Sequence, residues 1–350
     1  MGSESIRRGV LIGAMVLLPG GAAAERELCV YVTASGTVAQ VTGRELIPAE
    51  YRPGARCFSE RPGRSGTPGE SGSSPVNGSR SSNLALPAEI DLGNSVRRVT
   101  MASSIGRVNL RWPRSLEKLF GRTPERAMAE AARAVSRALK SAAFPVSLQT
   151  LDSVWEVVFM DENLPAEQIP ASLISNCHPG WMTPPANIYV VAERVASGCG
   201  GGRQSSADAD AVLANVLIHE IGHAVEYRLL GAYFGQSRMR AEGFATWFQI
   251  YAADYAPLIP RGSTRADYFE AARAAFRRNP GSFEFTGSGE DYARAAMFFV
   301  AIEARRGVRG VLEVYETMTR ERLDFLAAVE ARLGWSARKL QSEVERVLSR

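Results

Sequence analysis

Two histidines lie four positions apart in an apolar segment, and this pair constrains the fold more than any other feature of the chain. The segment is ANVLIHEIGHAVEYRLL, residues 214–230, and it contains His219, Glu220 and His223. Side chains at positions i and i+4 of an α-helix share one face, about one turn apart. Two imidazoles placed in this way can bind one metal ion, with Glu220 beside them. The chain contains three histidines, and two of them are in this pentapeptide.

A third ligand is needed for a catalytic zinc ion, which usually takes three protein ligands and keeps one position for water. His178 is the one histidine outside the pair, so a carboxylate is favoured as the third ligand. Glu242 is the leading candidate, because it begins a second helical segment 19 positions after His223. That gap allows the first helix to end, the chain to turn at Gly231 or Gly235, and a carboxylate to reach the imidazoles.

The pentapeptide HEIGH, 18 further residues and then a glutamate in AEGFATW resemble the gluzincin zinc metallopeptidases. This group includes thermolysin-like and aminopeptidase N-like enzymes and the bacterial peptidase-MA-like domains. The motif covers residues 219–246, and a looser likeness in the order of elements extends over about 140–320. The resemblance implies a zincin-like α+β fold.

The resemblance also implies a set of site residues. His219, His223 and Glu242 are expected to bind one Zn²⁺ ion, and Glu220 is the expected general base. The zinc ion lowers the pKa of its bound water to about 7. Glu220 is expected to take the proton of that water and pass it to the leaving amine, which hydrolyses a peptide bond.

Two further positions are compared with the family pattern. Aminopeptidase N-like relatives carry a transition-state tyrosine on a later helix, and Tyr292 is the candidate here, although alanine and arginine follow it where those relatives have a glycine. An ordinary aromatic residue at a helix start is the alternative. Thr246 occupies the place of the aspartate with which thermolysin-like enzymes orient a histidine. Glu226 either orients His223 or belongs to a solvated helix face, and the second interpretation is favoured.

Substrate is expected at the edge strand before the HExxH helix, which in such enzymes binds peptide backbone by strand addition. The segment 187–191, NIYVV, is the best match, with Asn187 and Tyr189 as predicted substrate-binding residues. A GAMEN-type exopeptidase motif is absent from the sequence, which disfavours an aminopeptidase. His178 is interpreted as a surface loop histidine rather than a residue of the cleft.

Residues 1–24 have the features of a secretory signal peptide. Two arginines precede an apolar run at 10–18, and three alanines at 22–24 provide a cleavage site before Glu25. The run is too short to cross a bilayer as a helix, and a retained membrane anchor is the alternative. We expect an exported protein, periplasmic or extracellular, with no stable membrane span after signal cleavage.

The four cysteines predict disulfides, because an even number of cysteines is typical of disulfide pairing in an exported protein. Proximity along the chain suggests the pairs Cys29–Cys57 and Cys177–Cys199. Four cysteines allow three pairings, and free buried thiols are the alternative.

Composition divides the mature chain into three parts. Residues 25–58 alternate apolar and polar residues around a turn and predict a small disulfide-linked β-hairpin module. Residues 59–83 are rich in Gly, Ser and Pro and predict a disordered linker, because they contain almost no apolar side chains to bury. Residues 84–350 form the predicted gluzincin-like metallopeptidase domain.

The fold class expected for this domain is α+β, with a small mixed β-sheet, the HExxH helix and a mainly helical C-terminal half. Helix formers and terminal glycines indicate where the helices lie. Strands are predicted at 96–101, 108–112, 155–160 and 188–195, and helices at 124–143, 209–230, 237–254, 264–278, 289–306, 308–320, 323–333 and 336–348.

The expected partner is a peptide or protein substrate, with envelope proteins among the candidates. The net charge of +4 is small and spread along the chain, so nucleic-acid binding is not predicted. Three alternatives remain open. The HEIGH pattern is a coincidence on an ordinary helix, the protein is a catalytically silent zinc-binding scaffold of the envelope, or the same site hydrolyses a non-peptide amide.

Overall fold

The chain divides into two compact units, Met1–Ser82 and Asn83–Arg350, and each is described here by itself. The computed structural model describes residues 26–32, 38–42, 56–60, 92, 95–120, 123–146, 148, 154–161, 178–197, 206–231 and 237–350. The predicted signal peptide, most of the predicted linker and the predicted Cys177–Cys199 bridge lie outside these residues.

The first unit contains a three-stranded antiparallel sheet. Its strands are β1 (Arg26–Val32), β2 (Val38–Thr42) and β3 (Arg56–Glu60), in the order β2-β1-β3. A third strand therefore joins the predicted hairpin and continues two residues into the predicted linker. The register places Cys29 opposite Cys57. Directly opposed residues have Cα atoms about 4.5–5.5 Å apart, within the range that a disulfide spans, so this backbone is compatible with the predicted Cys29–Cys57 bridge.

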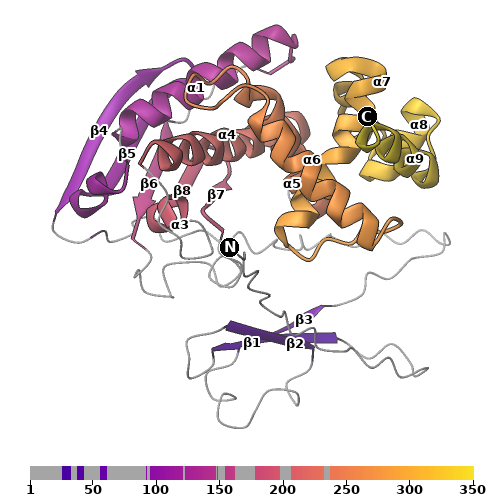
Figure 1. Cartoon of the computed structure of the whole chain (residues 1–350), viewed down its shortest axis with the longest axis horizontal. Helices are drawn as coiled ribbons and strands as arrows, with labels where there is room; N and C mark the ends of the chain where they lie inside the picture. The colour runs from indigo at the N-terminus through magenta and orange to yellow at the C-terminus, as the bar shows by residue number, and fades with distance from the viewer. Residues whose placement is uncertain are drawn as a thin grey trace, which may run out of the picture. The chain divides into compact units, whose positions relative to one another are not determined.

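The second unit contains a five-stranded mixed sheet with helices, which confirms the predicted small mixed sheet at this level of description (Figure 1). A β4–β5 hairpin is followed by parallel pairing of β5 with β6 and of β6 with β8, and β7 pairs antiparallel with β8. The strands lie in the order β4-β5-β6-β8-β7 and comprise β4 (Val96–Ser103), β5 (Gly106–Pro113), β6 (Trp155–Met160), β7 (Gly180–Thr183) and β8 (Asn187–Val191).

The predicted edge strand is wrong, because β8 lies between β6 and β7. The edge strand before the long helix is β7, which the sequence patterns do not predict. Its four residues, GWMT, stand between Pro179 and Pro184-Pro185, so a turn dominates the local pattern. The predicted strand 188–195 also ends early, at Val191, because Ala192–Ser197 forms the short helix α3 from good helix formers.

The helices follow the predicted pattern closely. The predicted break at Gly307 is confirmed, because this residue has a φ of 65° and divides α7 into two helical segments. No helix in the described ranges has the length and apolar character needed to cross a membrane. Besides the 3₁₀ turn η3 (Arg114–Lys118) and the short helix α3, the described helices are α1 (Pro124–Ser141), α4 (Ser206–Leu230), α5 (Arg238–Ala253), α6 (Ser263–Arg278), α7 (Gly289–Glu321), α8 (Phe325–Leu333) and α9 (Ala337–Leu348).

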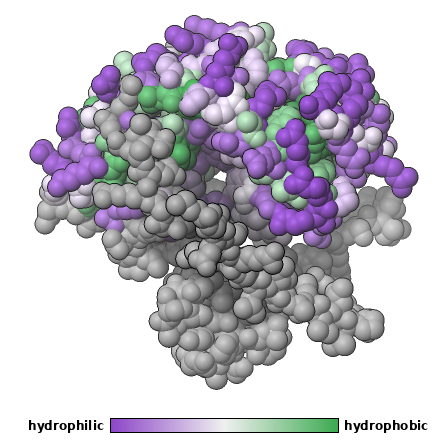
Figure 2. All heavy atoms as spheres, viewed as in Figure 1, coloured by the Kyte–Doolittle hydropathy of each residue, from purple (hydrophilic) through white to green (hydrophobic). Residues whose placement is uncertain are grey.

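One hydrophobic core runs from the sheet through α1, α4 and α5 to α7 and α8. Trp112 and Trp155 fill it at the sheet, while Trp247 and Phe299 fill it between α5 and α7. In the same view, Figure 2 shows hydrophilic side chains over much of the visible face of the C-terminal helices. These helices therefore bury one face and expose the other, as amphipathic helices do.

A buried polar cluster ties α4, α5 and α7 together. Glu226 is 0% and Arg240 is 2% exposed. The Oε1 atom of Glu226 accepts hydrogen bonds from Arg240 Nε at 2.8 Å and from Tyr315 Oη at 2.7 Å. The interpretation of Glu226 as part of a solvated helix face is therefore wrong, because α5 and α7 cover this turn of α4. The cluster joins the two helices that carry the predicted metal ligands.

Replacing Arg240 should destabilise the protein strongly, because it leaves the Glu226 carboxylate buried without its cation. We expect Arg240→Met to lower the free energy of unfolding by about 3–5 kcal/mol, measured by urea denaturation. Arg309→Met is the matched control, since Arg309 is 66% exposed in its ion pair with Glu313 and should change stability by at most about 1 kcal/mol. Adding Glu226→Gln to Arg240→Met should restore part of the loss. A single variant as stable as its control would contradict the role of this cluster.

Candidate metal centre

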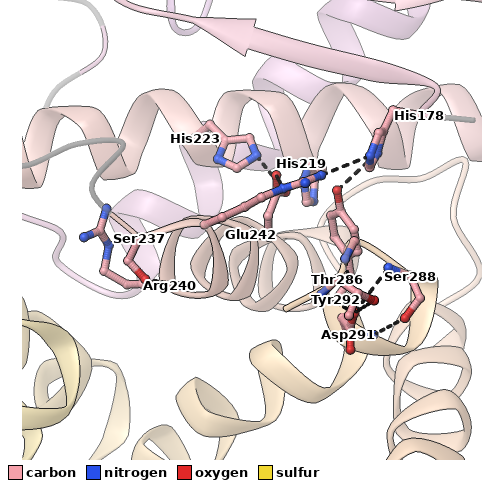
Figure 3. A network of polar contacts seen from close by, with 12 residues as sticks. His178, His219, His223, Ser237, Arg240, Glu242, Thr286, Ser288, Asp291 and Tyr292 are labelled. Atoms are coloured by element: carbon pink, nitrogen blue, oxygen red, sulfur yellow. Dashed lines mark hydrogen bonds and ion pairs between the residues drawn. The ribbon is translucent and has the colours of Figure 1, made fainter. Parts of the chain in front are cut away.

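The structure brings His219, His223 and Glu242 together. The two histidines project from one side of α4, and Glu242 points toward them from α5 (Figure 3). The Nε2 atom of each imidazole lies 3.3 Å from Glu242 Oε2. The imidazole rings are 4.8 Å apart between centroids and meet at 86°.

The donor set fits a zinc ion. One ligand atom from each of His219, His223 and Glu242 lies within 4.8 Å of the others, and these three form the single such group of His, Cys, Asp or Glu among the described residues. Zinc bonds of about 2.0–2.2 Å in tetrahedral geometry separate neighbouring ligand atoms by about 3.3 Å. The two nitrogen-to-oxygen separations of 3.3 Å match this value. Two imidazoles and one carboxylate are also a ligand set that catalytic zinc sites use.

Two glycines allow the helices to approach closely enough for this convergence. A Cβ atom on Gly222 of α4 would lie 3.2 Å from Ala245 Cα and 3.3 Å from its carbonyl oxygen. A Cβ atom on Gly243 of α5 would lie 2.9 Å from the carbonyl carbon and oxygen of Ala295 on α7. The glycines of HEIGH and AEGFA are therefore packing residues, a role that the motif comparison did not reveal.

Electrostatics favour an ionised carboxylate between the imidazoles. Burial acts to raise the pKa of Glu242, but His223 and His219 outweigh it and hold this pKa far below its ordinary value. Burial acts to lower the pKa of His223, but the charge and the hydrogen bond of Glu242 outweigh it and raise this pKa above its ordinary value. The negative charge of Glu242 therefore contacts both imidazoles directly.

Glu220 is buried beside this group, and its Oε2 atom has no hydrogen-bond partner among the residues that the structure describes. It is 3% exposed, and burial raises its pKa to about 8, with His219 acting to lower it and Glu242 to raise it. An unpaired buried carboxyl group is unfavourable unless a ligand or a reaction uses it. Its position next to the ligand group suits proton transfer.

The edge strand β7 passes directly over Glu220. A Cβ atom on Gly180 would lie 3.1 Å from Glu220 Oε1 and 3.0 Å from Val216 Cγ1. Val191 N donates to Pro179 O at 2.9 Å. Hydrogen-bonded pairs alternate along an antiparallel ladder, so the backbone groups of Gly180 and Met182 point away from β8. No further described strand pairs with this edge.

The predicted substrate residues Asn187 and Tyr189 lie on β8, one strand inside the sheet. Tyr189 stacks on Trp181 of β7, with ring centroids 5.1 Å apart and an interplanar angle of 15°. Asn187 Nδ2 lies 3.4 Å from Thr183 Oγ1. Strand addition at β8 is therefore not available, and these two side chains instead contact β7.

Tyr292, the tyrosine that the family resemblance suggests, lies beside His219 of the candidate ligand group. Its ring centroid is 6.1 Å from that of His219, and burial together with Glu242 raises its pKa far above the ordinary value. A capping box of Ser288 and Asp291 starts α7 just before Tyr292, and Asp291 Oδ2 also accepts from Thr286. This network, drawn in Figure 3, fixes where the tyrosine enters the site.

Thr246 does not make the contact that its predicted orienting role requires. It is fully buried on α5, and its hydroxyl has no hydrogen-bond partner among the described residues. His178, interpreted as a surface loop histidine, instead lies against Tyr292, with His178 Nδ1 at 3.1 Å from Tyr292 Oη. Arg238, which the sequence patterns do not single out, reaches both His178 and Glu242. The contacts of His178 with Tyr292 and with Arg238 join segments far apart in the chain, so no local sequence signal identifies them. The contact of Arg238 with Glu242 has the i,i+4 spacing of one helix.

The chain matches no protein-family model, no curated protein and no solved structure in the three comparisons with known proteins. A functional interpretation therefore depends on the geometry and chemistry of the residues themselves. The convergence of three ligands beside a buried carboxyl group is the main observation for that purpose.

Adding a methyl group at Gly243 should separate α5 from α7 and displace the neighbouring Glu242. We expect Gly243→Ala to destabilise the protein by about 1–3 kcal/mol, although alanine favours a helix more than glycine. The same variant should bind zinc more weakly in a calorimetric titration. Gly289→Ala is the control, because a Cβ atom there meets nothing within 4 Å. Equal stability of the two variants would contradict the close crossing.

The buried Glu220 should make the metal-free protein less stable as the pH rises. Between its ordinary value of 4.5 and about 8, the folded protein keeps a proton that the unfolded chain has lost. The free energy of unfolding should fall across this window, by at most about 5 kcal/mol. Glu220→Gln lacks this dependence, so its stability relative to wild type should increase from pH 5 to pH 9. Urea denaturation with a chelator measures the difference, and a pH-independent difference would contradict the burial effect.

Proposed function

We propose that the protein is a zinc-dependent peptidase of gluzincin type with a zincin-like fold, exported to the periplasm or the extracellular space. The observation that carries the proposal is the convergence of His219, His223 and Glu242 beside the buried, unpartnered Glu220. A structural histidine pair needs no such carboxyl group. A hydrolytic site needs a base next to the metal ligands.

The residues of the chain have separate roles in this proposal. His219, His223 and Glu242 would hold the zinc ion, which acts as a Lewis acid when bound. Glu220 accepts a proton from the attacking water at Oε2 and returns it to the leaving nitrogen. A zinc ion bound beside it would lower its raised pKa, so that the ionised carboxylate can accept this proton near neutral pH.

Substrate backbone is proposed to bind along β7. In this proposal the backbone groups of Gly180 and Met182 that point away from β8 pair with an extended peptide, which adds to the sheet as a further strand. Gly180 lies next to Glu220, so a peptide bond at this point of the strand reaches the base. Because backbone hydrogen bonds do not depend on the side chains of the substrate, this binding mode favours a peptide or protein substrate over a small molecule.

Tyr292 is proposed to donate a hydrogen bond to the oxygen that becomes negative in the transition state. Burial and Glu242 raise its pKa, so the hydroxyl keeps its proton at neutral pH. A donor placed at developing charge lowers the barrier by a few kcal/mol. The position of Tyr292 next to the His219 ring supports this role.

The proposal is tested by metal analysis and a peptide-library digest of the purified protein. We expect one zinc ion per chain and cleavage by the wild type. Glu220→Gln should lower kcat by at least about 10³-fold while zinc content stays at one, because the base is lost and the ligands remain. Glu330→Gln on α8 removes an exposed carboxylate and is the matched control.

Each contrary outcome selects a different alternative. Zinc binding without cleavage of any peptide would favour the scaffolding role, and cleavage of a cell-wall amide alone would favour the non-peptide hydrolase. Unchanged peptide cleavage by Glu220→Gln would refute the assigned base. Failure of the protein to bind zinc would remove the basis of the proposal.

A further inference from the structure

A chain of polar contacts runs from Arg238 through His178 to Tyr292. Arg238 Nη2 lies 3.2 Å from His178 Nε2, and His178 Nδ1 lies 3.1 Å from Tyr292 Oη. His178 lies just before β7, while Arg238 begins α5 and Tyr292 is near the start of α7. Three segments distant in sequence therefore meet at this side of the metal centre (Figure 3).

The hydrogen-bonding capacity of arginine determines the tautomer of His178. A guanidinium group carries donors and no acceptor. His178 Nε2 must therefore offer its lone pair to Arg238, which excludes a proton on that nitrogen. A neutral imidazole then carries its proton on Nδ1. Burial lowers the pKa of His178, which agrees with the neutral form.

The tautomer determines in turn how the Tyr292 hydroxyl is used. With a proton on Nδ1, His178 donates and Tyr292 Oη accepts. The Tyr292 hydroxyl therefore does not donate to His178, and its hydrogen can be donated to another acceptor. The His219 ring, 6.1 Å from the Tyr292 ring, marks the metal centre beside it.

Three contacts restrain the Arg238 guanidinium, although 46% of its side chain is exposed. Its guanidinium carbon lies 5.3 Å from the centroid of the Phe285 ring, and Phe285 packs edge-on against Tyr292 at 5.2 Å. Arg238 Nε also lies 3.9 Å from Glu242 Oε1. The guanidinium is therefore restrained by an aromatic face, a carboxylate and an imidazole together.

We propose that Arg238 and His178 are positioning residues that fix Tyr292 as a hydrogen-bond donor toward the metal centre. Arg238 selects the Nδ1–H tautomer of His178, and His178 orients the Tyr292 hydroxyl. The catalytic consequence rests on the proposed peptidase function, whereas the tautomer itself does not.

The tautomer is tested without any substrate by ¹⁵N NMR of histidine-labelled protein at about pH 8, with and without added zinc. The chain contains only three histidines, so the signals that vanish in His178→Asn belong to His178. We expect a protonated Nδ1 and an unprotonated Nε2. Arg238→Met should turn this into a mixture of tautomers. An Nε2–H tautomer or an imidazolium in the wild type would overturn the inference.

The positioning role is tested by a double-variant cycle with peptide cleavage as the readout. We expect His178→Ala to lower kcat about 10-fold, with KM within about twofold and zinc content unchanged. In the Tyr292→Phe background the same change should have no further effect, because His178 acts through that hydroxyl. His178→Asn, which can place an amide donor near the Nδ1 position, should retain more activity than His178→Gln. Additive losses in the two backgrounds would overturn the role.

The two measurements separate this inference from the proposed function. If the wild type cleaves nothing but shows the Nδ1–H tautomer, the peptidase proposal fails and the hydrogen-bond chain stands. If the wild type cleaves peptides but shows the other tautomer, the positioning inference fails alone. The variants keep the backbone contact from Arg194 Nη1 to His178 O at 3.2 Å, which does not involve the imidazole.

Discussion

The close crossing of α4 and α5 is the constraint on which the rest of the second unit depends. At Gly222 and Ala245 the helices approach so nearly that a Cβ atom on Gly222 would stand 3.2 Å from the facing backbone. This approach sets the reach of Glu242 toward the imidazoles of α4. One turn beyond His223, the buried contact between Glu226 and Arg240 holds the same two helices in register. The close packing at Gly222 and the ion pair of Glu226 with Arg240 thus fix the distance between α4 and α5, which carry the candidate metal ligands.

The buried carboxyl groups around this crossing differ in the partners that offset their desolvation, and the difference bears on function. Arg240 and the Tyr315 hydroxyl offset the desolvation of Glu226, and two imidazoles offset that of Glu242. The Oε2 atoms of Glu226 and Glu220 both lack a hydrogen-bond partner among the described residues, but Glu226 also forms an ion pair with the buried Arg240. Folded proteins rarely leave a buried carboxyl group unpaired without a functional reason. The fold therefore tolerates this cost at the position where a proton carrier would be useful.

Local patterns predict the helices and the ligand group well, whereas contacts between distant segments escape them. The spacing of His219 and His223 and the position of Glu242 follow from helical periodicity, and the break at Gly307 follows from the preference of glycine for positive φ. Local propensity identifies NIYVV as the last strand before the HExxH helix and misses the proline-flanked GWMT, which has weaker β propensity. Strand order is decided by tertiary pairing, which one sequence does not encode in its local propensities. The burial of Glu226 and the contacts of His178 likewise depend on where α5 and α7 pack.

The strand that local propensity does not predict, β7, is also the one that links sheet and site. A methyl group added at Gly180 would have Val216 and Glu220 of α4 and the carbonyl oxygen of Tyr189 all within 3.1 Å. Any side chain there would press on the carboxyl group or separate the strand from the helix. A residue without a side chain therefore sets the separation between strand β7 and the buried carboxyl group of Glu220. Since His178 lies just before this strand and contacts Tyr292, the placement of β7 governs both the base and the hydroxyl donor.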